Sequence, residues 1–203
     1  MRTNSNQFDR RSSDRCQTLA GRTTSSRAGF TLIEIMISLV VLVMTLLGFS
    51  QALISSMVTS RVNREVAVAT DAARHIISDL QGEAFDQVFA NFNSGAAGNL
   101  LGNTVVTNSG FAIPGLRAMA GDADGFVGTI RMPESTVIGV IQLREDLNDA
   151  QLGMPRDLDG EGPGVDAADH SGDYLILPVV VEVDWLGAAG PAHLEFKTIL
   201  ANY

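Results

Sequence analysis

Two carboxylate features of this 203-residue chain could do chemistry: a group of closely spaced carboxylates near residue 160 and a single glutamate at residue 34. Asp157, Asp159 and Glu161 occupy alternate positions, and Gly162 stands sixth in the segment that Asp157 opens. This spacing matches the first half of a calcium loop of the EF-hand type, and Asp166 follows closely enough to add an oxygen ligand. We therefore predict a calcium ion bound by Asp157, Asp159, Glu161 and Asp166.

The match to a calcium loop is incomplete. Its twelfth position is Ala168, where a bidentate glutamate is expected, and no pair of helical patterns flanks the segment. The alternative is a solvent-exposed acidic loop in which aspartates and glycines form turns. The sequence leaves both interpretations open.

The other carboxylate is Glu34, the only charged residue in the apolar run 30–49. A charge near the centre of a bilayer costs roughly 3 kcal/mol on insertion scales, so Glu34 calls for a partner or a function. Gly29, just before the run, leaves an extended backbone with no side chain to clash in a protease cleft. Cleavage there would free an amine at Phe30, and pairing that amine with Glu34 of another subunit would offset the cost of both charges.

The segment 29–34 reads Gly29, Phe30 and then Thr-Leu-Ile-Glu, and a long apolar run follows it. Together they resemble the N-terminal signature of type IV prepilins and type II secretion pseudopilins. The resemblance implies that a membrane-embedded prepilin peptidase cuts after Gly29 and N-methylates Phe30. It also implies that Glu34 pairs with the N-terminal amine of a neighbouring pilin or pseudopilin subunit during assembly. The alternative is an uncleaved membrane anchor with an incidental glutamate.

The net charge of −9 is unevenly distributed, because residues 1–29 carry six arginines against two aspartates. Positive residues before a membrane span favour a cytoplasmic N-terminus, which places the later domain beyond the inner membrane, in the periplasm. The acidic remainder argues against nucleic acid as a partner, since phosphate contacts need basic side chains. Cys16 is the only cysteine, so a chain cut after Gly29 has no disulfide.

We expect four segments. They are a cleaved leader at 1–29, a transmembrane or filament-core half of a helix at 30–54, an amphipathic half of that helix at 55–92, and a β-rich periplasmic or extracellular head at 93–203. The first half is long enough to span a bilayer core of ~30 Å. Because no proline occurs between residues 30 and 92, we predict a mostly continuous helix, weakened locally at Gly48.

The second half of the predicted helix carries an apolar stripe that needs a partner surface, which we expect to be a β-sheet rather than a coiled-coil partner. Its members recur every three to four residues: Val62, Val66, Ala69, Ala73, Ile76, Ile77, Leu80 and Ala84.

The head should hold a small antiparallel sheet, which gives an α+β fold with the long N-terminal helix packed on that sheet. Residues 91–110, rich in Asn, Ser and Gly, are expected to form a loop. Strands are predicted at 126–132 and 136–143 around a turn at 133–135, and at 174–177 and 179–185 on either side of Pro178. A turn at 187–191 should return the chain along 193–200, completing a hairpin with period-two alternation.

No enzyme is expected. His75, His170 and His193 are widely separated and lack metal-ligand spacing, and no nucleophile elbow or phosphate-binding loop is present in the sequence. No cofactor is required beyond the predicted calcium. The resemblance therefore implies a structural minor subunit of a type IV pilus. The alternatives are a minor pseudopilin of a type II secretion system and a membrane-anchored binding protein that never polymerises.

Overall fold

The computed structural model describes residues 29–162 and 164–202, so the predicted leader at 1–29 lies outside the described residues except for Gly29. The chain divides into two units between Leu47 and Gly48, within the first helix.

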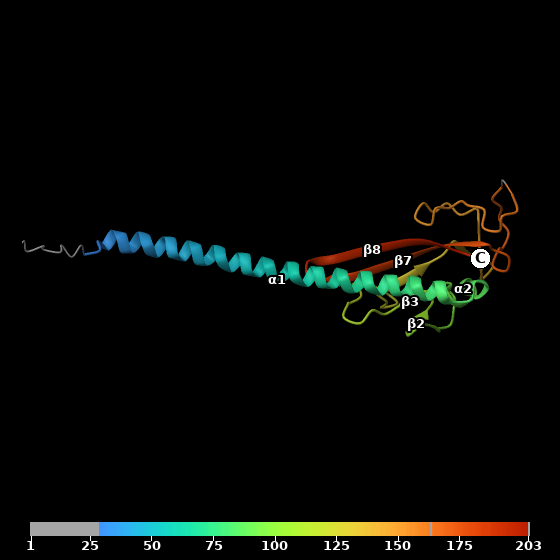
Figure 1. Ribbon diagram of the computed structural model, residues 1–203, viewed down its shortest axis with the longest axis horizontal. Coiled ribbons are helices and arrows are strands. Elements are labelled where there is room, and N and C mark those ends of the chain that lie inside the picture. The colour runs from blue at the N-terminus through green and yellow to red at the C-terminus, as the bar shows by residue number, and fades with distance from the viewer. Residues whose placement is uncertain (1–28, 163, 203) are drawn as a thin grey trace, which may run out of the picture. The chain divides into compact units, whose positions relative to one another are not determined.

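The helix α1, Leu32–Gly82, continues through Gly48 as the sequence predicts (Figure 1). Its 51 residues correspond to a length of about 77 Å. Hydroxyl groups in its apolar part donate to the helix's own carbonyls, as Ser38 does to Glu34 at 2.7 Å and Thr45 does to Leu42 at 2.8 Å. Such bonds satisfy polar groups without water. Among the described residues, α1 is the one helix long and apolar enough to cross a membrane.

The predicted stripe of α1 is confirmed at its centre, where Ala69, Ala73, Ile76 and Leu80 are buried. These side chains join the same hydrophobic core as the valines of the sheet. The small alanines allow the helix to approach the sheet closely. The expectation of a sheet as the partner of this helix is therefore confirmed.

The helix ends at Gly82 rather than near residue 92, which corrects the predicted boundary. Glycine is a weak helix former, and Ala84 adopts an extended backbone with φ −63° and ψ 118°. A separate helix, α2, spans Phe85–Phe92 and buries Val88, Phe89 and Phe92. After the break, these three side chains join the same hydrophobic core as the buried stripe of α1.

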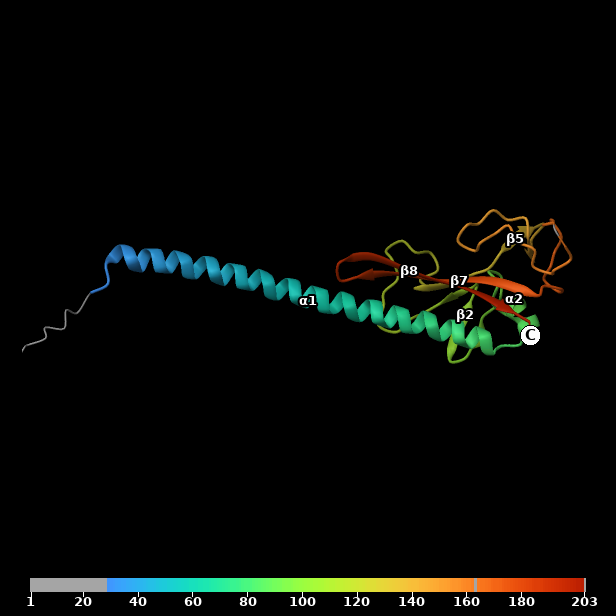
Figure 2. The same cartoon turned by 45° about the horizontal axis from the view of Figure 1, so that its top comes forward.

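The main sheet has six strands in the order β1-β2-β3-β4-β7-β8, and every neighbouring pair is antiparallel. The later part of α1 runs beside it (Figures 1 and 2). This confirms the α+β class with one helix packed on an antiparallel sheet. The strands are β1 Asn99–Leu101, β2 Thr104–Thr107, β3 Gly110–Phe111, β4 Gly128–Arg131, β7 Ile176–Gly187 and β8 Gly190–Ala201.

The strands β7 and β8 form the predicted hairpin, with Gly187 opposite Gly190 at its turn. Pro178 does not interrupt β7, although the sequence suggested two pieces around it. The neighbour β4 pairs with β7 only along Val180–Val183, so the missing N–H of Pro178 lies beyond that ladder. The alternating face predicted for β7 is confirmed, since Val179, Val181, Val183 and Trp185 are all buried.

Two further predictions about the strands are wrong. Residues 91–110 are not one loop, because β1, β2 and the start of β3 lie there. The segment 136–143 is not one strand either. It contributes to a separate hairpin of β5 Glu134–Val137 and β6 Val140–Leu143. The turn lies at Ile138 and Gly139, both with positive φ, and not at 133–135.

Candidate functional site

The first turn of α1 is built by Thr31 and Glu34. The backbone N–H of Glu34 donates to the Thr31 hydroxyl at 3.3 Å and to the Thr31 carbonyl at 3.0 Å. A threonine followed three residues later by a glutamate is the sequence of a capping box, and an acidic side chain in the first turn complements the helix dipole. Glu34 thus has a local role at the helix start that the sequence prediction did not include.

The carboxylate of Glu34 stands in an apolar surface. Phe30 is 78% exposed, and Leu32, Ile33 and Ile35 are exposed beside it. Among the described residues, no hydrogen bond or ion pair involves the Glu34 carboxylate. A Cβ built at Gly29 would meet nothing within 4 Å. The region around Gly29 and Phe30 is therefore open to another molecule, and Glu34 retains its capacity to accept.

The predicted calcium segment lies in the long connection between β6 and β7. Leu158 is fully buried and anchors this connection, and its carbonyl accepts the N–H groups of Leu175 at 2.7 Å and Ile176 at 3.0 Å. The N–H of His170 donates to the Leu143 carbonyl at 3.0 Å, at the end of β6. These bonds fold the acidic segment back over the end of the β5–β6 hairpin.

Three of the four predicted calcium ligands accept backbone N–H groups within the loop, as the turn interpretation expects. Asp157 accepts from Gly160 at 2.6 Å, and one oxygen each of Asp159 and Asp166 accepts from the residue two positions later. Glu161 lies beside Asp159 and Asp166 in the lining of one cavity of about 220 Å³. Calcium binding by these residues stays a prediction.

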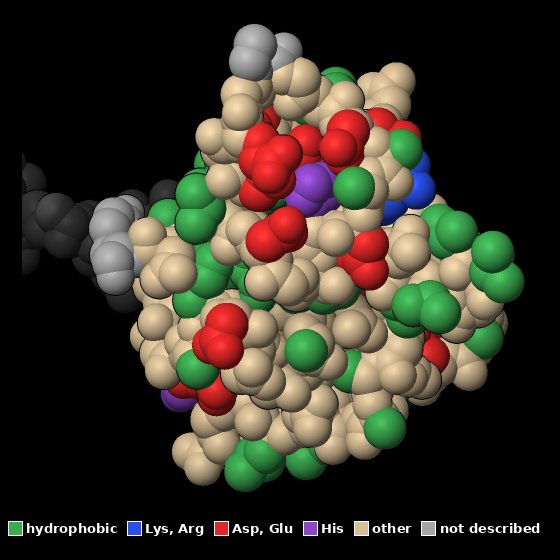
Figure 3. Space-filling view, turned by 90° about the vertical axis from the view of Figure 1, so that its right-hand side faces the viewer, with side chains coloured by type: hydrophobic (Ala, Val, Ile, Leu, Met, Phe, Trp, Pro, Cys, Tyr) green, Lys and Arg blue, Asp and Glu red, His purple; other side chains and the backbone are tan. Residues whose placement is uncertain are grey.

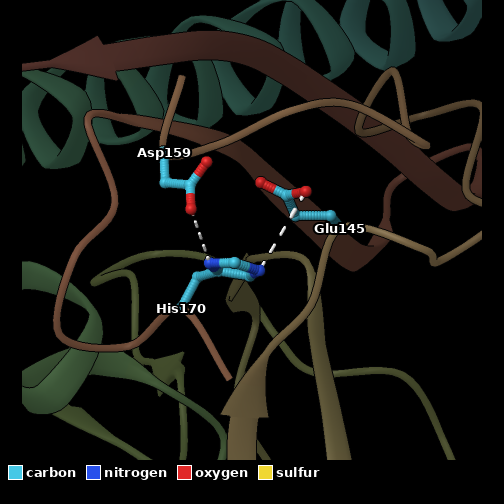
Figure 4. A group of neighbouring side chains, drawn as sticks. All are labelled: Glu145, Asp159 and His170. Atoms are coloured by element: carbon cyan, nitrogen blue, oxygen red, sulfur yellow. Dashed lines mark ion pairs between the residues drawn. The ribbon is translucent and has the colours of Figure 1, made fainter. Parts of the chain in front are cut away.

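The centre of the cluster is His170, which the sequence did not single out. Its Nε2 lies 3.0 Å from Asp166 and 4.0 Å from Glu145, and its Nδ1 lies 3.3 Å from Asp159 and 3.4 Å from Asp173. Figure 3 shows acidic side chains gathered around a histidine at this end of the molecule. In Figure 4, Asp159 and Glu145 point toward different nitrogens of the ring.

The electrostatics of His170 combine two opposing effects. Burial lowers its pKa, but the hydrogen bond to Asp166 and the charges of Glu145, Asp159 and Asp173 raise it, and the net result is a raised pKa. The pKa of Asp166 is lowered, first by the Ala168 N–H and then by His170. The site is thus strongly negative and favours a cation, either a proton on His170 or a bound ion.

Glu145 is the second residue that the sequence prediction missed. It is 2% exposed, and its carboxylate accepts the N–H of Leu158. Glu145 and His170 are 25 positions apart and follow no motif spacing. The one available signal was a histidine within a run of acidic residues, which by itself does not identify a partner.

One comparison with known proteins concerns the segment that contains the first of these two sites. Residues 24–50 match the family model described as the prokaryotic N-terminal methylation motif. No curated protein and no solved structure matches the chain significantly. The matched segment contains Gly29, Phe30 and Glu34 together with the apolar start of α1. The chain therefore carries, at its N-terminus, the signature of type IV pilins and pseudopilins.

Proposed function

We propose that this protein is a structural minor subunit of a type IV pilus, cut after Gly29, N-methylated at Phe30 and assembled through the apolar part of α1. The observation that carries the proposal is the match of residues 24–50 to the methylation motif; Gly29 and the lone carboxylate of Glu34 lie in this segment, beside and within the start of an apolar helix. The work of such a subunit is assembly, not catalysis.

The apolar surface of α1 supports assembly. Its side chains from Leu32 to Val58 are largely exposed, and exposed apolar area of this extent marks a membrane or protein contact. Before assembly a bilayer would cover it, and in a filament the corresponding helices of neighbouring subunits would do so. The arginine-rich segment 1–29 supports a cytoplasmic N-terminus, with the head in the periplasm until assembly.

Glu34 supports a specific register between subunits. Cleavage after Gly29 creates an amine at Phe30, four residues before Glu34. Each charge alone is costly in an apolar environment, so the arrangement in which a neighbour's amine meets Glu34 is favoured over arrangements that leave both unpaired. Apolar packing along α1 has many near-equivalent offsets, and this charge pair selects one of them.

We assign the chain to a minor subunit because the valine-rich β7, with Trp185 near its end and a return strand after it, resembles the corresponding hairpin of minor pilins and minor pseudopilins. A minor pseudopilin of a type II secretion system is the second candidate, because the methylation motif is common to both classes. The third is a membrane-anchored binding protein that never polymerises.

Deletion and complementation in the native host test the proposal. A pilus subunit should be recovered in sheared surface filaments, and its deletion should reduce filament number while leaving protein secretion intact. Loss of secretion with normal filaments would assign the chain to the secretion system. Recovery of the protein only in the membrane fraction, with neither defect, would contradict both assembly roles.

A further inference from the structure

We infer that the cavity between Glu145, Asp159 and His170 is a binding site for a divalent transition-metal ion of the zinc class. All three side chains come from the connection between β6 and β7. One ligand atom from each lies within 4.8 Å of the other two. Ligand atoms around one zinc ion are about 3.4 Å apart in tetrahedral geometry, so small side-chain rotations would close the site.

The strongest observation is the state of the His170 ring. His170 is 4% exposed, and its Nδ1 is buried without a hydrogen-bond partner among the described residues. Its Nε2 is bonded to Asp166 at 3.0 Å. A metal-binding histidine typically donates its other ring N–H to a carboxylate, which fixes the tautomer and leaves a lone pair for the metal. In this arrangement Asp166 orients the ring and Nδ1 is the ligand.

The remaining ligands are carboxylate oxygens with spare capacity. One oxygen of Asp159 accepts the Glu161 N–H, and the other faces Nδ1 at 3.3 Å. Likewise, one oxygen of Glu145 accepts the Leu158 N–H, and the other lies 4.0 Å from Nε2, so the Glu145 side chain has to turn toward Nδ1 to join the same ion. Asp173, 3.4 Å from Nδ1, is placed to add a further oxygen. The loop bonds hold these carboxylates in position, and each retains an oxygen that can bind a cation.

The donor set decides the class of ion. Calcium prefers oxygen ligands alone, whereas imidazole nitrogen with carboxylates suits zinc and its neighbours in the first transition series. The site differs from the predicted calcium loop, since it excludes Asp157 and uses Glu145 and His170. A bound ion would tie together residues 145, 159 and 170 in a chain whose only cysteine is Cys16. The role we assign to it is structural, in place of a disulfide.

The main competitor is a protonated His170, which would supply the cation itself. An imidazolium has no free lone pair, so it would exclude the metal. The test uses the full chain in detergent micelles, purified without a polyhistidine tag and with Cys16→Ser to remove the thiol. Zinc chloride is titrated into chelator-stripped protein by calorimetry, and melting is followed with zinc, with calcium and with chelator. We expect one zinc per chain, a higher Tm with zinc, and reversal by chelator.

Variants locate the ion. His170→Ala should abolish binding or weaken it at least tenfold, and Asp166→Asn should weaken it by roughly 10–100-fold. His193→Ala is the matched control, because His193 also lies near two carboxylates, Asp184 at 2.8 Å and Glu195 at 4.0 Å, but is exposed. It should bind zinc as the parent does. If His170→Ala fails to fold, the absorption spectra of the cobalt-loaded parent and of cobalt-loaded Asp166→Asn are compared instead. A difference between the two spectra would place the ion beside the His170 ring that Asp166 orients, and identical spectra would contradict this placement.

Several results would overturn the inference. They are the absence of zinc binding by folded protein, binding that survives His170→Ala unchanged, and stabilisation by calcium but not by zinc. If calcium but not zinc stabilises the protein and Asp157→Asn loses this stabilisation, the result would instead support the calcium loop predicted from the sequence.

Discussion

Glu34 combines two roles that can be separated by substitution. It lies in the first turn of α1, where an acidic residue is worth about 0.3–1 kcal/mol through the helix dipole. Its carboxylate also stands within an apolar surface with no ionic partner among the described residues. The interaction with the helix dipole needs only this chain, whereas the proposed charge pair needs a second subunit. A variant that loses the charge should therefore affect assembly more than folding.

Replacing Glu34 with valine should leave cleavage after Gly29 intact but lower incorporation into filaments. We expect a decrease of roughly tenfold or more, which corresponds to about 1.4 kcal/mol lost from each contact. The measurement compares the amount of protein in sheared filaments with that in membranes. Asp71→Asn, which removes an exposed carboxylate from the same helix outside the apolar run, is the control. Equal incorporation of Glu34→Val and the control would exclude the register role.

Tyr174 links α2 to the start of β7. Its hydroxyl donates to the Phe85 carbonyl and accepts the Phe89 N–H at 3.4 Å, and its ring lies 4.8 Å from the Phe85 ring. Tyr174→Phe keeps the ring contact and loses both bonds, so it should reduce the free energy of unfolding by about 1–3 kcal/mol. Chemical denaturation measures this loss. Tyr174→Ala, which also removes the ring, should cost more, and equal costs would show that the hydroxyl contributes nothing.

The same residue gives a pH dependence. Burial is the main cause of the raised pKa of Tyr174, so the folded state disfavours its ionised form. A raised folded pKa means that this stabilisation is complete below the ordinary tyrosine pKa and is lost as pH rises through the folded pKa. Parent protein should therefore lose stability in the alkaline range by an amount that Tyr174→Phe does not show. Identical alkaline profiles for the two proteins would contradict this reasoning.

Among the elements, the pairing of β3 with β4 requires a residue without a side chain at position 128. Gly128 of β4 pairs with Phe111 of β3, and a Cβ at Gly128 would lie 2.2 Å from carbons of the Phe111 ring. Gly128→Ala should therefore displace the buried ring and destabilise the head by about 1–3 kcal/mol. The Tm reports the effect. Gly172→Ala, at a position with no atom within 4 Å of the added Cβ, should leave the Tm unchanged. A stable Gly128→Ala would mean that the ring has space to move.

The elements differ in how far the sequence predicts them. The hairpin β7–β8 is recognisable because period-two alternation of apolar and polar residues runs along 181–185 of β7 and 194–197 of β8, and glycines flank its turn. The strands β1 to β3 are two to four residues long, so the loop-forming composition around them outweighs their short apolar pattern. Ile138 is a further difficulty, because a β-branched residue at φ 51° is unusual and no turn was expected there.

The two candidate sites also differ in how far the sequence predicts them. Gly29, Phe30 and Glu34 lie within six consecutive residues, so spacing alone identifies them. The cluster around His170 depends on the burial of Leu158 and on the bond from His170 to Leu143, which are tertiary contacts. Sequence spacing cannot report them. Asp159 and Asp166 were predicted as ligands, but the histidine that brings them together was not.

For the whole molecule, the two proposed functions, assembly and presentation of the head, belong to different units of the chain. The apolar start of α1 carries the methylation motif and the exposed apolar side chains, and the later unit contains the buried core of helix and sheet. Assembly through the first part and presentation of the head would then be separable functions. Core substitutions such as Gly128→Ala should lower stability without altering cleavage after Gly29.

The central claim is that this chain is a processed assembly subunit, and the mass of its mature N-terminus tests it most directly. Intact-protein and peptide mass spectrometry of the protein from its native host should show a chain that begins at Phe30 and carries one added methyl group on the new amine. Gly29→Leu should block this conversion, because a large side chain would enter the cleavage position. A native protein that retains residues 1–29 and has no methyl group at Phe30 would contradict the account.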